Sequence, residues 1–174
     1  MLFRVPADAS TESWRIEPIR EEHVPSYRAA LDAVARERRF LLMLEAPPLV
    51  AAREFVLGNL RDGNPQVVAL AGDTVVGWCD ILRGGMPTRR HAGTLGIGVL
   101  ERWRGRGIGG SLLLAAIGLA RERGFERIEL AVRVDNPGAR LLYERLGFEH
   151  EGRLRRHLRV DGESHDSFVM ALLL

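Results

Sequence analysis

Arg104-Gly105-Arg106-Gly107-Ile108-Gly109-Gly110 is the stretch that decides the fold of this chain. It lies between an apolar run typical of a strand and a long apolar run typical of a helix. Glycines let the backbone curl with its N–H groups pointing inward, and they bring no Cβ that would hold an anion away. Helical spacing from Ser111 to Arg123, followed by Gly124, predicts that this loop opens a helix whose N-terminus adds positive field. The stretch therefore predicts a phosphate-binding loop.

Two known phosphate loops fit this stretch poorly. A nucleotide-hydrolase loop needs G-x-x-x-x-G-K-[ST], and the chain contains no lysine. Gly105, Gly107 and Gly110 satisfy the G-x-G-x-x-G of dinucleotide-binding folds, with Glu129 near the place of a ribose-binding acid. The short remainder of the chain ends in a hairpin-like pair, whereas that fold needs further parallel βαβ units. A nicotinamide-binding oxidoreductase therefore remains a weak alternative.

The segment Arg104-x-x-Gly107-x-Gly109 resembles the [QR]-x-x-G-x-[GA] signature of the GNAT superfamily of acyl-CoA N-acyltransferases. Downstream, residues 136–148 resemble that superfamily's N-x-x-A-x-x-L-Y-x-x-x-G-F segment, and upstream residues 95–99 resemble its fourth strand. The resemblance covers the chain from about Trp14 to Leu174. The sequence pattern is similar to that of small bacterial amino-acid, antibiotic and ribosomal-protein N-terminal acetyltransferases. It implies an α+β GNAT fold, with a mixed, mostly antiparallel sheet of about seven strands and about four helices, splayed between strands four and five.

Composition is compatible with a single cytoplasmic domain. A chain of 174 residues with 46% apolar content can bury one core, so we expect a flexible leader at residues 1–13 and one domain at residues 14–174. All 25 cationic residues are arginines, yet the net charge is only +2, which suits an anionic ligand and is too small to indicate nucleic acid. A single cysteine, no secretory segment and no apolar membrane span predict a cytoplasmic protein without a membrane partner.

Hydrophobic periodicity and turn residues predict the order of the elements. Besides the helix after the glycine loop, helices are expected at residues 23–39, 49–60 and 138–146. Strands are expected at residues 14–18, 66–71, 74–82, 95–99, 127–132, 148–160 and 167–173. Gly72-Asp73 and Asp161-Gly162 are the hairpin turns. Hairpins around one strand–helix–strand crossover indicate an α+β mixed sheet.

The resemblance implies acetyl-CoA as co-substrate and a set of residues that bind it. The backbone of Ile97 and Val99 would pair with the pantetheine arm like an added strand. Asn136 matches a position that often binds this arm, although it fits equally well as a helix cap before Pro137. The pyrophosphate would bind the loop formed by Arg104, Gly105, Arg106, Gly107, Ile108, Gly109 and Gly110.

Tyr143 matches the tyrosine that protonates the departing thiolate in many superfamily members. A thiol pKa of about 8.5 lies below the phenol pKa of about 10, so the transfer is uphill. It requires the site to lower the tyrosine pKa or a water to share the role. A packing tyrosine is the alternative.

The general base is where the chain departs from the pattern. Some relatives carry a glutamate at the position of Ala131, which cannot accept a proton. Candidates in its place are Glu129, His91, Asp80 and Glu37, each with a structural role as the alternative. His91 has the unperturbed pKa that best suits a base near neutral pH.

A site that lacks a strong general base favours acceptor amines of low pKa. Deprotonating a lysine-like amine at pH 7 costs about 4.6 kcal/mol, whereas an α-amine costs only about 1.4 kcal/mol. We therefore expect an amino acid, a peptide N-terminus or a similar small amine. Its binding residues would be Glu37 for an ammonium, Arg38 for a carboxylate and Phe40 for an apolar side chain, with a solvated helix end as the alternative.

These observations predict an N-acetyltransferase that acts by direct attack in a ternary complex. The alternative is a catalytically inactive GNAT-fold module that binds acyl-CoA and regulates a partner. The five histidines show no metal-ligand spacing, so no metal is expected. Arg153, Arg155, Arg156 and Arg159 lack interleaved aromatic residues, which indicates a solvated face or subunit contact and not nucleic acid. The family habit alone implies a homodimer.

Overall fold

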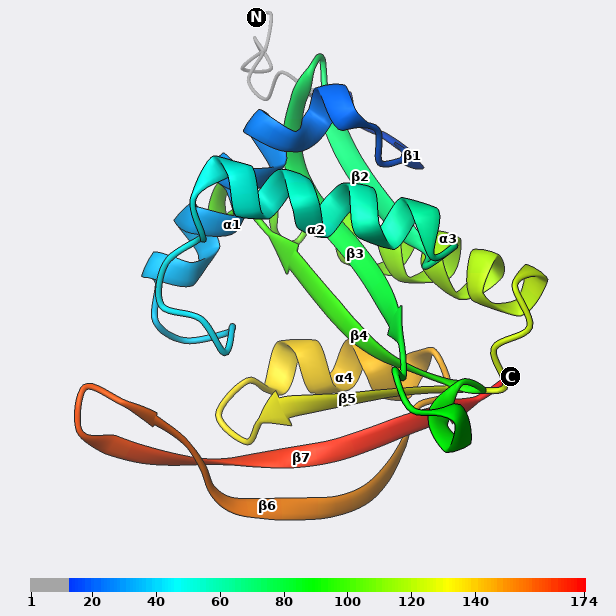
Figure 1. The fold of residues 1–174 in the computed structure, drawn as a ribbon. Helices are drawn as coiled ribbons and strands as arrows, with labels where there is room; N and C mark the ends of the chain where they lie inside the picture. Colours follow the sequence, from blue (N-terminus) through cyan, green and yellow to red (C-terminus); the bar gives the residue numbers. More distant parts are fainter. Residues whose placement is uncertain (1–12) are drawn as a thin grey trace, which may run out of the picture.

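An open sheet of seven strands carries helices on both of its faces in the computed structural model, which describes residues 13–174 (Figure 1). The helices are α1 (Val24–Arg36), α2 (Leu49–Arg61), α3 (Ile108–Glu122) and α4 (Pro137–Arg145), with 3-10 turns η1 (Glu21–His23), η2 (Pro87–Arg89) and η3 (Glu101–Trp103). The strands are β1 (Arg15–Pro18), β2 (Gln66–Ala71), β3 (Thr74–Arg83), β4 (Ala92–Val99), β5 (Arg127–Arg133), β6 (Glu149–Val160) and β7 (Glu163–Leu173). The predicted mixed α+β sheet is confirmed. Of the leader expected at residues 1–13, all but Ser13 lies outside the described residues.

The sheet has the order β1-β2-β3-β4-β5-β7-β6, and β4 with β5 is its one parallel pair among the described strands. These two strands pair only at Ala92↔Arg127, Gly93↔Ile128 and Thr94↔Glu129. Beyond Thr94, β4 continues to pair with β3 as far as Val99. The edge of β4 that faces β5 is therefore open over its second half. Figure 1 shows the two strands diverging from this short contact.

Alternating side chains of the central strands supply two cores. Val67 and Ala69 point to the face covered by α3, whereas Val68 and Leu70 point to the face covered by α1 and α2. On the α3 side, Leu112 and Leu113 are fully buried against the sheet. Each such leucine contributes about 1.5–3 kcal/mol relative to an exposed one. Burial on both sides fixes the two central strands, so the open edge of β4 lies on a rigid support.

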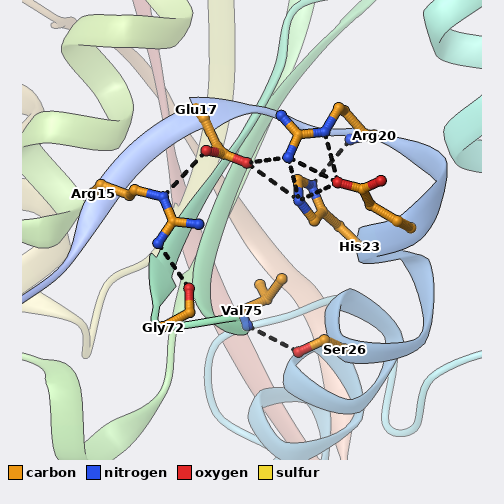
Figure 2. Close-up of polar contacts among 8 residues, drawn as sticks. Arg15, Glu17, Arg20, His23, Ser26, Gly72 and Val75 are labelled. Carbon is orange, nitrogen blue, oxygen red and sulfur yellow. Dashed lines mark hydrogen bonds and ion pairs between the residues drawn. The ribbon is translucent and has the colours of Figure 1, made fainter.

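A polar cluster at the N-terminal side joins β1 to the start of α1 (Figure 2). The Nη2 atom of Arg20 lies 2.8 Å from Oε1 of Glu17, and Nε2 of His23 lies 3.2 Å from the same oxygen. The Arg20 backbone N–H donates to Nδ1 of His23. Burial is the main cause that lowers the pKa of His23, so its ring is neutral at pH 7. One helical turn later, the Ser26 hydroxyl accepts from Val75 N–H at 2.8 Å, which fixes α1 over β3.

Several predicted boundaries are wrong, each for a local reason. The first helix stops at Arg36 and not near residue 39, because Arg38 adopts a left-handed conformation with φ 57°. The α3 helix begins at Ile108, three residues before the predicted Ser111. The β4 strand begins at Ala92, since its first residues pair with β5.

Gly93 allows β4 to pack closely against its neighbours, because a Cβ added there would lie 2.5 Å from Ile81 and 2.7 Å from the Phe125 ring. We expect Gly93→Ala to lower the free energy of unfolding by about 1–3 kcal/mol through overpacking. Gly118→Ala is the matched control in α3, where an added Cβ meets nothing within 4 Å. It is expected to stabilise the protein by about 0.5–1 kcal/mol. Urea unfolding of both variants measures this, and equal midpoints for Gly93→Ala and wild type would contradict it.

Candidate active site

A pocket of about 570 Å³ occupies the place where β4 and β5 diverge. Its walls come from the open half of β4, the glycine loop with the start of α3, the end of β5, α4 and the segment after α1. The structure brings these predicted site residues together in its lining: Phe40, Ile97, Val99, Arg104, Gly105, Gly107, Ile108, Gly109, Gly110, Asn136 and Tyr143. It leaves these outside the lining: Glu37, Arg38, Asp80, His91, Arg106 and Glu129.

The glycine loop presents free backbone donors to this pocket. Gly105 and Gly107 have φ of 73° and 81°, which L side chains rarely adopt. Within residues 13–174, none of the N–H groups from Gly105 to Gly110 donates to a backbone carbonyl. These donors lie at the N-terminus of the 15-residue helix α3, whose dipole adds to their field. The arrangement can hold a phosphate or pyrophosphate.

The side chain of Arg104 turns away from the phosphate position. Its two Nη atoms bind the Glu37 carboxylate at 2.8 and 2.5 Å, and its Nε donates to the Val99 carbonyl at 2.9 Å. The guanidinium also lies 4.7 Å from the ring centre of Phe40. Arg104 thus joins the end of α1 to the end of β4 beside the loop, and Glu37 is committed to that contact. The backbone N–H of Arg104 donates to the Glu101 carbonyl at 3.1 Å, so the free backbone donors of the loop begin at Gly105.

Backbone groups of Ile97 and Val99 face the gap between the strands. Leu100 N–H donates to Val76 on the β3 side, and Ala92 accepts from Gly84 on the same side. Alternate residues of a strand direct their backbone groups to opposite edges, so Ile97 and Val99 point theirs toward β5. No β5 residue pairs with them, since the ladder ends at Thr94. An extended ligand can pair with this edge as an added strand.

Tyr143 comes from α4 and lies on the α3 side of the gap. It is 7% exposed and packs on Phe148, with ring centres 5.7 Å apart. Burial raises the pKa of Tyr143 far above its ordinary value, so the phenol stays protonated at neutral pH. The free site therefore does not lower this pKa, which was one of two expected ways to ease proton transfer. A thiolate formed in the same apolar surroundings is also desolvated. Desolvation raises the pKa of the thiol and so reduces the difference between the thiol and phenol pKa values.

Asn136 caps α4, because its Oδ1 accepts from Ala139 N–H at 3.2 Å. The residue also lines the pocket, and no described residue accepts from its amide nitrogen. Both expected roles are therefore compatible with this position. The side-chain oxygen caps the helix, and binding of a ligand by the side-chain nitrogen stays a prediction.

Two of the candidate bases lie at the closed end of the β4–β5 pair. Glu129 is opposite Thr94 and binds Arg89 and Arg127. Burial by itself would raise the pKa of Glu129, but the hydrogen bonds from these two arginines bring it below its usual range. His91 is exposed and precedes β4, where its carbonyl accepts from Glu126 N–H. The structure does not bring either residue to the pocket.

The expected acceptor-binding cation is also engaged elsewhere. The Arg38 guanidinium binds both carboxylate oxygens of Asp161, at 2.8 and 2.5 Å, across the tip of the β6–β7 hairpin. Phe40 alone of the three predicted acceptor residues lines the pocket. Sequence reasoning missed Leu142 and Trp103 in the lining, although Leu142 directly precedes Tyr143 in the motif.

Residues 13–174 contain no group of three or more His, Cys, Asp or Glu residues placed to hold a metal ion. None of the described helices is long and apolar enough to span a membrane.

The left-handed turn at Gly107 generates a prediction for ligand binding. If the loop keeps its shape, an alanine there costs about 1–2 kcal/mol in backbone strain. If the loop relaxes to relieve this strain, its N–H donors no longer point at the anion. We expect Gly107→Ala to raise the Kd of coenzyme A by about 10-fold, in keeping with about 1.4 kcal/mol. Isothermal titration measures this, with Gly118→Ala as the control in the same helix. An unchanged Kd for Gly107→Ala would contradict the assignment of the loop.

Comparison with known proteins identifies acetyltransferases, which agrees with a pocket that can hold a phosphate and an extended ligand. The family model described as "Acetyltransferase (GNAT) family" matches residues 16–148. The L-amino acid N-acetyltransferase AaaT of Escherichia coli (strain K12) is 37% identical over 112 residues, which are 64% of this chain and 69% of that protein. The N-alpha-acetyltransferase RimI of Mycobacterium tuberculosis is 36% identical over 124 residues, covering 71% of this chain and 73% of that one.

Among solved structures, a GNAT-family acetyltransferase from Streptococcus pneumoniae superposes with a TM-score of 0.87 at 25% identity, covering 93% of this chain and all of that one. The predicted GNAT fold is thereby confirmed, and the structure places the predicted splay between strands four and five after the third β4–β5 pair. The chain therefore belongs to the acetyltransferase (GNAT) family, and it is an acetyl-CoA-dependent N-acetyltransferase.

Proposed function

We propose that this protein transfers the acetyl group of acetyl-CoA to the α-amine of an amino acid, a peptide N-terminus or a similar small molecule, by direct attack in a ternary complex. One observation carries the proposal. A single pocket joins an unpaired strand edge, a loop of free N–H donors and a buried, protonated tyrosine. These are the groups that acyl transfer from a thioester requires for binding the donor and protonating its leaving group.

The donor would bind by its backbone contacts. The N–H groups of Gly105 to Gly110 would receive the pyrophosphate, and the edges of Ile97 and Val99 the amide-bearing arm. This leaves the thioester in the gap between β4 and β5, because the arm runs along β4 from the loop. In this arrangement the activation barrier is lowered by orienting the reacting groups, and no covalent enzyme intermediate is required.

The chemical step needs one bond formed, one broken and two proton transfers. The amine nitrogen attacks the carbonyl carbon, and the carbon–sulfur bond breaks as the tetrahedral intermediate collapses. The nitrogen releases a proton and the sulfur receives one. Tyr143 is the proposed proton donor to sulfur, since its phenol is protonated and lines the pocket.

An α-amine is the acceptor class that the site supports best. The described lining of the pocket contains no aspartate or glutamate, and its charged members are Arg104 and Arg145. Such a lining disfavours a polycation and is compatible with a substrate that carries a carboxylate. Relatives named for L-amino acid and N-alpha acetylation agree with this class. The low cost of deprotonating an α-amine, about 1.4 kcal/mol at pH 7, points the same way.

Thiol release from acetyl-CoA against a panel of amines tests the acceptor class. We expect turnover with L-amino acids or short peptides, and kcat/KM at least about 10-fold lower with spermidine, because its amines have a higher pKa and the charged residues that line the pocket are both arginines. Faster turnover on spermidine than on every α-amine would contradict the proposal.

Replacing Tyr143 by Phe tests the proposed acid. The change removes one hydroxyl from a site that keeps its packing on Phe148. We expect kcat to fall about 10²–10⁴-fold, the usual range for general acid catalysis, with the Kd of coenzyme A within twofold of wild type. A leaving thiol of lower pKa than coenzyme A would restore part of the rate. An unchanged kcat would assign Tyr143 to packing alone.

A further inference from the structure

Asp80 is a buried carboxylic acid without a partner. It lies in β3, is 6% exposed, and forms no hydrogen bond or ion pair with any residue from 13 to 174. Its neighbour Trp78, on the same strand face, belongs to the core beneath α1, whereas Cys79 belongs to the core beneath α3. Successive strand residues point to opposite faces, so Asp80 points to the α1 side of the sheet. A carboxyl group in such a place lowers stability, so its presence points to a function.

The space beside Asp80 is kept open by Gly96. The two residues are directly opposite in the β3–β4 register. A Cβ added to Gly96 would lie 2.8 Å from Oδ1 of Asp80, so any side chain there would collide with the carboxyl group. Gly96 is itself partly exposed. The Asp80 carboxyl therefore reaches the β4 backbone at a point where no side chain of β4 intervenes.

This point lies at the level of the strand divergence. The last β4–β5 pair is Thr94↔Glu129, and two residues further along each parallel strand come Gly96 and Ala131. Both lie on the face to which Asp80 points, because residues two apart on a strand share a face. Ala131 is exposed and lines the pocket. Asp80, Gly96 and Ala131 thus form one row across the gap, with a carboxyl group at one end and none at the other.

Tyr143 belongs to the opposite side of the sheet. It packs in the core beneath α3, together with Cys79. A thioester held in the gap would have Tyr143 on one face and Asp80 on the other. An amine that attacks from the α1 face would place its departing proton on the Asp80 side and the departing sulfur on the Tyr143 side.

We propose that Asp80 is the general base of this enzyme, taking the proton of the acceptor amine over Gly96, directly or through one water. This inference rests on the proposed acetylation of α-amines. As the nitrogen–carbon bond forms, the ammonium proton passes to a carboxylate oxygen of Asp80. The carbon–sulfur bond then breaks and sulfur takes the proton of Tyr143. Asp80 returns its proton to solvent and Tyr143 regains one, which restores both groups.

The electrostatic surroundings suit this role. Burial raises the pKa of Asp80 to about 7, close to the pH at which a base works best. Tyr27 from α1 and Cys79 on its own strand are titratable groups on which the Asp80 charge acts, and both stay neutral because burial, with a further contribution from Asp80, raises their pKa values. Its cross-strand neighbours Gln66 and Gly96 carry no charge. Glu129 differs, because two arginines hold its carboxylate ionised and occupied.

Asp80→Asn tests the inference, because it keeps the shape and removes the basic oxygen. We expect kcat/KM on an amino acid to fall about 100-fold, with the Kd of coenzyme A unchanged. The loss should shrink along a series of α-amines of falling pKa, such as an amino acid, its amide and aminoacetonitrile, since the nitrogen of a less basic amine gives up its proton more readily once it is bonded to the carbonyl carbon. Asp73→Asn, an exposed carboxyl group in the β2–β3 turn, is the matched control and should behave as wild type.

Stability supplies a second readout that separates lost chemistry from misfolding. An Asp whose pKa rises from about 3.9 when unfolded binds its proton more tightly in the folded state, so stability falls as pH rises from 4 to 7. Asparagine has no such penalty. Asp80→Asn should therefore unfold at a higher temperature than wild type at pH 8, with a difference that shrinks toward pH 4.

The outcomes separate this inference from the function on which it rests. Lower turnover with higher stability at pH 8, and a loss that depends on amine pKa, supports Asp80 as the base. Turnover of Asp80→Asn within threefold of wild type, or an equal loss on every amine, overturns this inference alone. Absence of thiol release by wild-type protein on every amine overturns the proposed function and this inference with it.

Discussion

The short parallel contact between β4 and β5 is the constraint on which the rest of the structure depends. Three residue pairs hold the strands together, and beyond Thr94 no residue of β5 pairs with β4, although the Val99 carbonyl accepts from Nε of Arg104 on this edge. Unpaired backbone groups inside a protein require a ligand or water, so this open edge is available to an extended ligand. The strand itself stays fixed because β3 pairs with it to Val99 and the central strands are buried on both faces.

Ion pairs between distant segments shape the mouth of this site. Glu37 and Arg104 are 67 residues apart in the chain, and Arg38 and Asp161 are 123 apart. The first pair joins the segment after α1 to the glycine loop, which is a wall of the pocket, and the second joins that segment to the tip of the β6–β7 hairpin, which lies outside the lining. Such partly exposed pairs contribute only about 0–1 kcal/mol each to stability. Their consequence is positional, because they commit charges that the substrate would otherwise meet.

Local signals made most of the fold predictable from sequence, and most of the residues expected to bind the donor line one pocket. Two-residue turns at Gly72-Asp73 and Asp161-Gly162 are confirmed, and the β2 strand has the predicted bounds. The roles expected for Glu37 and Arg38 could not be judged from sequence, because a charged residue shows no sign of a partner many residues away. The burial of Tyr143 could not be predicted from sequence either, because its raised pKa depends on the apolar residues packed around it from several elements. The short reach of the β4–β5 ladder is likewise a property of register and not of composition.

Amide hydrogen exchange with and without coenzyme A tests the central claim most directly, namely that the open edge of β4 and the glycine loop together bind the donor. The structure predicts slower exchange on binding at Ile97, Val99 and the N–H groups from Gly105 to Gly110, with Ile81 and other residues of β3 unchanged. Protection confined to other surfaces, or binding without protection of the β4 edge, would contradict it.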